Sequence, residues 1–107
     1  MATYLTAFKQ TADTWAKLAA NPVDRRESLG PVIEKMGGKL LGYWYAFGEV
    51  DGYALIEAPD DVAVAGLLVK VAASGALSVS TTKLLTVDEA LQAFQRAGEV
   101  DYRPPGA

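Results

Sequence analysis

The chain has 107 residues, a formal net charge of −3, and neither cysteine nor histidine. Hydrophobic residues make up 50% of the chain and charged residues 21%, which is typical of a globular domain rather than a disordered chain. A mildly acidic chain lacks the concentrated positive charge that nucleic acids and anionic membranes select. We therefore expect no nucleic acid and no membrane among its partners.

The missing histidine and cysteine exclude several classes of active site. Ser-His-Asp triads, thiolate nucleophiles, disulfides and zinc sites of histidine or cysteine all need these residues. Any general acid or base in this chain must be Asp, Glu, Lys or Tyr. We expect no metal and no cofactor, with a carboxylate-only Mg²⁺ or Ca²⁺ site as the alternative left open.

The N-terminal residues give no targeting signal. Residues 1–9 lack the basic start and long apolar stretch of a signal peptide. No apolar run approaches the roughly 18 residues that a membrane span needs. Because a cysteine-free chain also fits a reducing compartment, we expect a cytoplasmic protein.

The first half of the chain predicts one strand, a helical region and a hairpin. Residues 3–8 are β-branched, aromatic and aliphatic, which favours a strand. Helical spacing begins at Thr11, is interrupted at Pro22 and ends at Gly37-Gly38. Residues 40–47 and 50–58 are the next two strands. Gly48-Glu49 between them suits a two-residue type II′ turn, and a longer turn through Asp51-Gly52 is the alternative.

The second half predicts a helix, a strand and a last helix. Asp60 and Asp61 suit the start of a helix, because carboxylates accept hydrogen bonds from its free N–H groups. Its apolar stripe is expected to consist of Val62, Ala65, Leu68, Val69 and Ala72. Residues 77–85 form the fourth strand. Thr86 and Glu89 have the spacing of a capping box, which starts a helix that buries Leu91 and Phe94 and ends at Gly98.

This order of elements predicts an α+β fold of the ferredoxin-like type, β-α-β-β-α-β with an extra C-terminal helix. The four-stranded sheet is antiparallel and carries its helices on one face. We expect the domain to span residues 1–98 and residues 99–107 to form a tail. Residues 40–47 are apolar or aromatic on both sides of the strand, whereas a sheet face in water should be polar. The uncovered face therefore predicts self-association as a homodimer or larger homo-oligomer.

Residues 37–61 carry a resemblance to a known family. They read Gly-Gly-Lys-Leu-Leu-Gly-Tyr-Trp-Tyr-Ala-Phe-Gly-Glu-Val-Asp-Gly-Tyr-Ala-Leu-Ile-Glu-Ala-Pro-Asp-Asp, which resembles the core of the GYD domain family. The resemblance implies a dimeric α+β barrel, and it implies no particular activity. Val50 stands where the family usually has tyrosine in its Gly-x-Tyr-Asp hairpin. If that tyrosine carries chemistry in relatives, Tyr53 is the residue here that could replace it.

The hairpin register predicts which residues share a face. Toward the helices we place Tyr43, Tyr45, Phe47, Val50, Gly52, Ala54 and Ile56. On the other face we place Leu40, Gly42, Trp44, Ala46, Asp51, Tyr53, Leu55 and Glu57. This second face is expected to meet a dimer partner or to line a pocket.

Four residues on the second face are candidates for ligand binding. Trp44 and Tyr53 could line a slot for a small apolar or aromatic ligand; the alternative is that both rings fill a dimer interface. Asp51 and Glu57 could act as acid and base if they are buried. Their alternatives are local, since aspartate is common in turns and a glutamate at a strand end can remain in water.

Three functions are compatible with the sequence. The first is a small-molecule-binding or structural homo-oligomer without catalysis. The second is a cofactor-independent enzyme, of isomerase or oxygenase type, acting on a planar aromatic or enolisable substrate. The third is a regulatory subunit that binds another protein through residues 62–72 or the last helix. The sequence leaves open whether the protein is an enzyme.

Overall fold

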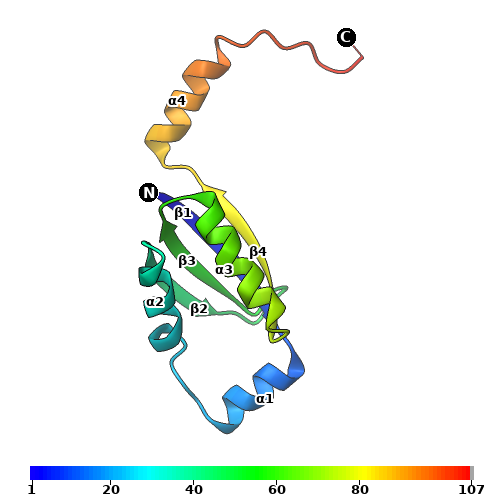
Figure 1. The fold of residues 1–107 in the computed structure, drawn as a ribbon. Helices are drawn as coiled ribbons and strands as arrows, with labels where there is room; N and C mark the ends of the chain where they lie inside the picture. Colours follow the sequence, from blue (N-terminus) through cyan, green and yellow to red (C-terminus); the bar gives the residue numbers. More distant parts are fainter. Residues whose placement is uncertain (107) are drawn as a thin grey trace.

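The computed structural model describes residues 1–106 as one sheet with four helices (Figure 1). Its strands are β1 (Ala2–Gln10), β2 (Lys39–Tyr45), β3 (Gly52–Ala58) and β4 (Leu77–Leu84). The strand order is β2-β3-β1-β4, and every neighbouring pair is antiparallel. This order fits a ferredoxin-like arrangement, so the predicted α+β fold class is confirmed.

The helices divide into a covering pair and a projecting pair. They are α1 (Ala12–Ala20), α2 (Arg26–Lys35), α3 (Asp61–Ala73) and α4 (Val87–Ala97). Helix α2 packs on β2, and α3 packs on β4 and β3, so both cover one side of the sheet (Figure 1). The predicted interruption at Pro22 is confirmed, because it lies in the segment between α1 and α2.

The molecule is elongated because α1, α4 and the C-terminal segment extend away from the sheet (Figure 1). Its radius of gyration is 17.5 Å and its extents are 57 × 34 × 22 Å. A compact domain of this length would have a radius of gyration of about 13 Å. The difference indicates that much of the chain lies outside a common core.

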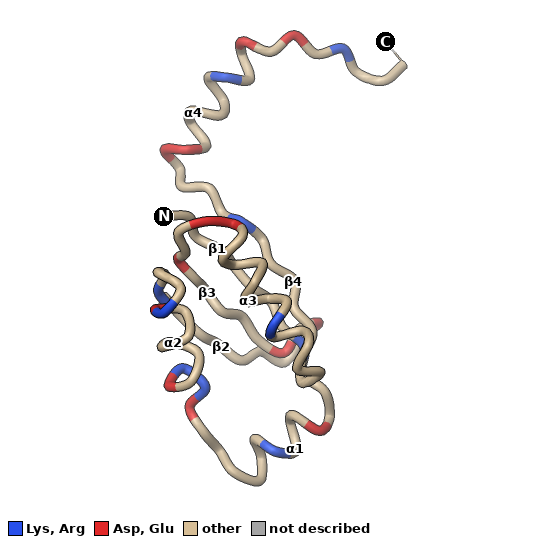
Figure 2. Tube along the Cα trace, viewed as in Figure 1, with Lys and Arg blue, Asp and Glu red and all other residues tan. Residues whose placement is uncertain are grey.

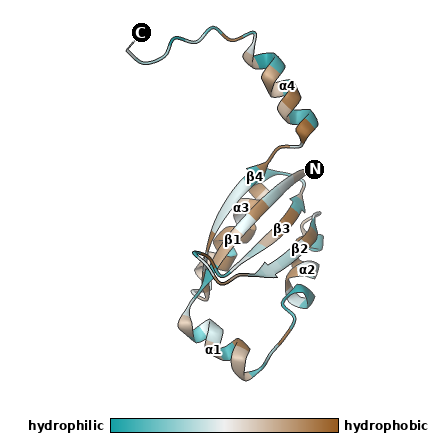
Figure 3. Ribbon diagram, turned by 180° about the vertical axis from the view of Figure 1, so that it is seen from behind, coloured by the Kyte–Doolittle hydropathy of each residue, from teal (hydrophilic) through white to brown (hydrophobic). Residues whose placement is uncertain are grey.

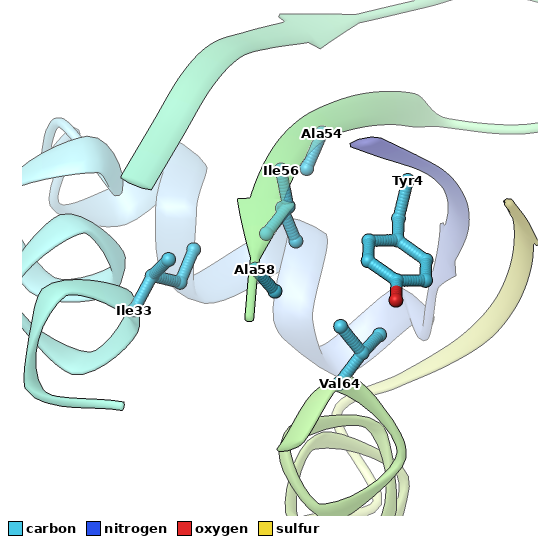
Figure 4. Packing of buried hydrophobic residues seen from close by; sticks show 6 residues of the cluster. All are labelled: Tyr4, Ile33, Ala54, Ile56, Ala58 and Val64. Carbon is cyan, nitrogen blue, oxygen red and sulfur yellow. The ribbon is translucent and has the colours of Figure 1, made fainter. Parts of the chain in front are cut away.

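The core lies between the sheet and the covering pair α2 and α3 (Figure 4). Its buried residues are Tyr4, Ile33, Ala54, Ile56, Ala58 and Val64. The β3 members alternate along the strand, as expected for one face of a sheet. Ile33 on α2 is completely buried. The predicted placement of Ala54 and Ile56 toward the helices is therefore confirmed.

The connection between β2 and β3 is longer than predicted. Tyr45 pairs with Gly52, as the predicted register requires, but residues 46–51 form a loop outside the strands. The Asp51 N–H donates to the Phe8 carbonyl oxygen at 2.8 Å, and the Ala46 N–H donates to the Asp51 carbonyl at 2.9 Å. The first bond ties the loop to β1 and the second joins the two ends of the loop, so the predicted two-residue turn at Gly48-Glu49 is wrong. Phe47, expected on the helix side, is fully exposed in this loop.

A β-bulge in β2 changes the predicted face of Leu40. Leu40 pairs with Ile56 and Gly42 pairs with Leu55, so Leu41 is the extra residue. Leu40 therefore shares the face of Ile56 and packs against the core. Its predicted position on the opposite face is wrong, because the extra residue reverses the alternation.

Two predicted apolar helix faces do not match the structure. On α3 the side toward the sheet is formed by Val64, Leu67, Leu68 and Val71, whereas Val62, Ala65 and Val69 are exposed. On α4 both Leu91 and Phe94 are exposed, so their predicted burial is wrong within this chain. The reason is that α4 has at most marginal contact with other elements of residues 1–106.

Candidate functional site

The side of the sheet turned away from α2 and α3, here called the open face, carries the residues that the sequence singled out. Figure 3 views the sheet from this side, with α2 and α3 behind it. The register places on it Gly42 and Trp44 from β2, Tyr53, Leu55 and Glu57 from β3, Thr3, Leu5 and Ala7 from β1, and Ser80, Thr82 and Leu84 from β4. An apolar centre is thus flanked by hydroxyl groups on the β4 edge.

Trp44 and Tyr53 lie directly opposite each other on neighbouring strands. A Cβ atom on Gly42 would overlap the indole ring of Trp44, so the ring lies across that glycine. The Trp44 side chain nevertheless remains 53% exposed. Trp44 and Tyr53 therefore both add exposed aromatic surface to the open face.

The two candidate carboxylates are not brought together with these rings. Asp51 lies in the loop after β2, where its Oδ2 accepts the Gln10 N–H at 2.7 Å. Glu57 lies opposite Lys39 and Thr3, four residues along β3 from Tyr53. Four residues of strand span about 13 Å. The arrangement therefore joins Trp44 with Tyr53 but separates Tyr53 from Glu57.

The helix side of the sheet holds a cluster of four aromatic rings. The ring centroids are 5.3 Å apart for Phe8 and Tyr43, 5.5 Å for Tyr43 and Tyr45, and 6.0 Å for Tyr45 and Trp15. Gly52 makes room for them, because a Cβ there would overlap the Phe8 ring and the Trp44 carbonyl oxygen. Burial, followed by the neighbouring Tyr45, raises the pKa of Tyr43. The Tyr43 hydroxyl therefore stays protonated at neutral pH.

An apolar hollow, here called the aromatic hollow, lies where α1 approaches the end of β2. Its volume is about 390 Å³, and it is lined by Trp15, Leu18, Ala19, Pro22, Val23, Tyr45 and Phe47. The Trp15 indole N–H and the Tyr45 hydroxyl are the polar groups among these side chains. Sequence reasoning missed this site, because Trp15 comes from a helix far from β2 along the chain.

A second group of titratable residues joins β1, α3 and β4. The Tyr4 hydroxyl donates to Asp61 Oδ1, and Lys83 Nζ lies 3.0 Å from the same oxygen. The bond to Asp61, together with burial, raises the pKa of Tyr4 to about 12. The bonds from Tyr4 and Lys83 lower the pKa of Asp61. Neither group changes protonation near neutral pH, so the cluster stabilises the fold rather than transferring protons.

A comparison with known protein families identifies the family of this chain. The family model of the GYD domain matches residues 4–94. The chain belongs to the GYD domain family. No curated protein and no solved structure matches the chain. The resemblance seen in residues 37–61 is therefore confirmed over most of the chain, and the match extends into α4 of this GYD domain.

Val50, where the resemblance implies a tyrosine in the family, lies outside the strands that form the open face. Val50 is half-buried in the loop of residues 46–51, next to Asp51. Tyr53, which could replace the missing tyrosine, lies further along the chain, on β3 and opposite Trp44. The two positions are thus in different parts of the hairpin.

A larger and more polar cleft of this GYD domain lies between α1 and the turn before β4. Its volume is about 580 Å³, and its lining includes Gln10, Lys17 and Arg25. The Gln10 Nε2 is buried without a hydrogen-bond partner among residues 1–106. Lys17 is held by Asp13 at 3.0 Å. None of the four sequence-predicted candidates lines this cleft or the aromatic hollow.

In the part of the chain that the structure describes, the GYD domain contains no group of three or more carboxylates that could hold a metal ion. Across the same residues, no helix is both long and apolar enough to span a bilayer.

Proposed function

We propose that this GYD domain is a non-catalytic homo-oligomeric binding domain in which two copies pair their open faces. The observation that carries the proposal is the apolar centre of the open face, where Trp44 lies opposite Tyr53 and both rings are partly exposed in residues 1–106. Apolar surface of this kind on a protein usually meets a partner. A second copy offers the same surface, so two-fold pairing buries both at once.

The polar groups around this centre fit such a pairing. Ser80 and Thr82 on the β4 edge can hydrogen-bond across an interface, whereas the charged side chains lie toward the ends of the strands, at Lys9, Lys39 and Glu57. A polar rim around an apolar centre is the usual anatomy of a protein interface. The proposal includes no reaction, because the Asp51 carboxylate is occupied by the Gln10 N–H and Glu57 lies far from Tyr53.

The experiment compares the wild-type protein with Trp44→Ala over a series of dilutions. Native mass spectrometry measures the fraction of paired chains at each concentration. Trp44→Ala should weaken pairing at least about tenfold, because it removes a large buried ring from each copy. The unfolding free energy of the separated chain should change little, since Trp44 is half-exposed there. Trp15→Ala is the matched control, because Trp15 packs on Tyr45 instead. A Trp44→Ala protein that pairs as tightly as wild type would rule out the open face as the interface.

A second candidate function, binding of a small aromatic molecule, is favoured by the aromatic hollow. Trp15, Tyr45 and Phe47 offer flat apolar walls, and the first two can donate hydrogen bonds. A planar aromatic molecule with one carbonyl oxygen matches both features. Sites of this volume and apolarity commonly bind small molecules.

Tryptophan fluorescence can test this candidate with acetylnaphthalene, a planar aromatic ketone, as the probe. In a Trp44→Phe background, Trp15 is the remaining tryptophan, so quenching reports on the hollow. Phe47→Ala should raise the dissociation constant of the probe about tenfold or more, since it removes one wall. Val87→Ala, a highly exposed apolar position on α4, is the control. Absence of quenching, or equal affinity in all variants, would contradict binding in the hollow.

A further inference from the structure

The apolar side of α4 is uncovered within residues 1–106. Val87, Ala90, Leu91 and Phe94 recur at helical spacing, and Leu91 and Phe94 are 50% and 68% exposed. The helix starts with a complete capping box, in which Thr86 and Glu89 exchange hydrogen bonds of 2.9 and 3.0 Å. A helix this short is marginal in water without packing. Packing of its apolar side on another surface would therefore stabilise α4.

Helix α3 offers such a surface on the side away from the sheet. This outer stripe consists of Val62, Ala65, Gly66, Val69 and Ala73. Val62 and Val69 are 81% and 69% exposed, and a Cβ on Gly66 would meet nothing within 4 Å. Between Asp61 in its first turn and Lys70 in its last, α3 carries only apolar residues and glycine. Helices that are apolar on every side are normally buried. Within residues 1–106, the outer side of α3 remains exposed.

The two helix faces complement each other in size and charge. The apolar side of α4 carries large side chains, whereas the outer stripe of α3 has only small residues at Ala65 and Gly66. The Phe94 ring can therefore pack against the stripe at that point. Asp88 and Glu89 lie in the first turn of α4, and Lys70 lies in the last turn of α3 (Figure 2). Antiparallel packing brings these opposite charges together and aligns the helix dipoles favourably.

The chain cannot make this contact with itself. Leu84 ends β4 and Val87 begins α4, so the link spans at most about 11 Å. Secondary-structure layers pack about 10 Å apart, and a helix on the outer stripe would lie two layers above the sheet, about 20 Å from β4. An α4 helix packed on the outer stripe of α3 would therefore come from another molecule.

We propose that α4 of one copy packs antiparallel on the outer stripe of α3 of a second copy, with Phe94 over Gly66. The contact is separate from the open face, because α3 covers the opposite side of the sheet. A chain with two separate self-association surfaces assembles beyond a dimer when both are used.

Cysteine cross-linking tests the contact directly, because the chain has no cysteine of its own. A Gly66→Cys protein is mixed with a Phe94→Cys protein under mild oxidation. A disulfide between two chains should form, since the two positions face each other in the proposed contact. Gly66→Cys mixed with Gln92→Cys should give little product, because Gln92 lies on the polar side of α4. All three positions are exposed, so the substitutions should not prevent folding.

The size of the assembly gives an independent readout in sedimentation velocity. Leu91→Glu should raise the dissociation constant of the α4 contact at least about tenfold, whereas Gln92→Glu, with the same added charge one residue away, should not. Repeating the cross-link in a Trp44→Ala background separates the two surfaces. If the cross-linked product still forms in that background while association through the open face is lost, both proposals are supported. If the product still forms and association through the open face is unaffected, only the open-face proposal is contradicted. Absence of a two-chain product, or a disulfide formed within a single Gly66→Cys, Phe94→Cys chain, would overturn the α4 contact.

Discussion

The two sides of the sheet are built from the same strands but differ in what covers them. On the helix side, Tyr43 pairs with Ala54 and Tyr45 with Gly52, so rings lie against small residues under α2 and beside α1. On the open face, Trp44 pairs with Tyr53 and both rings remain partly in water. The helix side therefore holds the fold together, whereas the open face and α4 are available for partners.

The strongest test of this division adds one methyl group to each face of the sheet, at Gly52 on the helix side and at Gly42 on the open face. Gly52→Ala should lower the unfolding free energy by about 2–3 kcal/mol, because the new Cβ overlaps the Phe8 ring and a backbone oxygen. Gly42→Ala should cost less, since the Cβ meets the exposed Trp44 ring, which can swing away. Urea unfolding of both variants measures the two costs.

The same pair of variants separates folding from assembly. Gly42→Ala should weaken pairing through the open face, because the Trp44 ring loses its position across Gly42. Equal losses of unfolding free energy in the two variants would show that the open face supports the fold as strongly as the helix side does.

The faces of the hairpin could be predicted because its residues alternate in size. Rings face small residues in the register that pairs Tyr45 with Gly52 and Tyr43 with Ala54, so Tyr43 and Trp44 were assigned to the correct sides. The loop of residues 46–51 could not be predicted, because its hydrogen bonds run to β1 as well as within the hairpin. Leu40 was misplaced for a similar reason, since a bulge at Leu41 leaves no local signal.

The helices show where periodicity fails. Helix α3 is apolar on nearly every side, so its spacing could not distinguish Val64, which is buried, from Val62, which is exposed. Helix α4 has a clear apolar side, and its start after Thr86 and its end at Gly98 were predicted correctly. Burial of Leu91 and Phe94 depends on tertiary contacts, which the spacing of residues along one helix does not contain.

The candidate sites divide in the same way. Trp44 and Tyr53 could be placed together because they lie on adjacent strands of one hairpin. The cluster of Tyr4, Asp61 and Lys83 depends on the order β3-β1-β4 and on how α3 crosses the sheet, so no local pattern of residues indicates it.

A comparison of two helix caps gives the next prediction. Asp60 accepts the Ala63 N–H at 2.7 Å at the start of α3, and Thr86 accepts the Glu89 N–H at 3.0 Å at the start of α4. Asp60→Ala should lower the unfolding free energy of the whole domain by about 1 kcal/mol. Thr86→Ala should leave that free energy unchanged and reduce only the helicity of α4, because α4 does not pack on the sheet.

Both cap variants are measured in a Leu91→Glu background, so that assembly through α4 adds no stability. Tryptophan fluorescence, recorded during urea unfolding, reports on the sheet. Far-ultraviolet circular dichroism reports on helicity. A loss of about 1 kcal/mol with Thr86→Ala would mean that α4 packs on its own chain, contrary to the structure.

The smallest predicted effect concerns the buried Tyr4 hydroxyl at alkaline pH. Its pKa is raised from 10.0 to about 12 by the bond to Asp61 and by burial. Below pH 10 both folded and unfolded chains keep the proton, so the contribution of Tyr4 to stability is complete. Between pH 10 and about 12 the unfolded chain releases this proton and the folded chain does not, so stability falls as pH rises.

Tyr4→Phe should therefore show a shallower loss of stability across this window. Every other ionisable group is present in both proteins, so the difference between their urea midpoints isolates Tyr4. Equal slopes would mean that the hydroxyl meets water in the folded state, and that the link between β1 and α3 is weaker than the bond to Asp61 suggests.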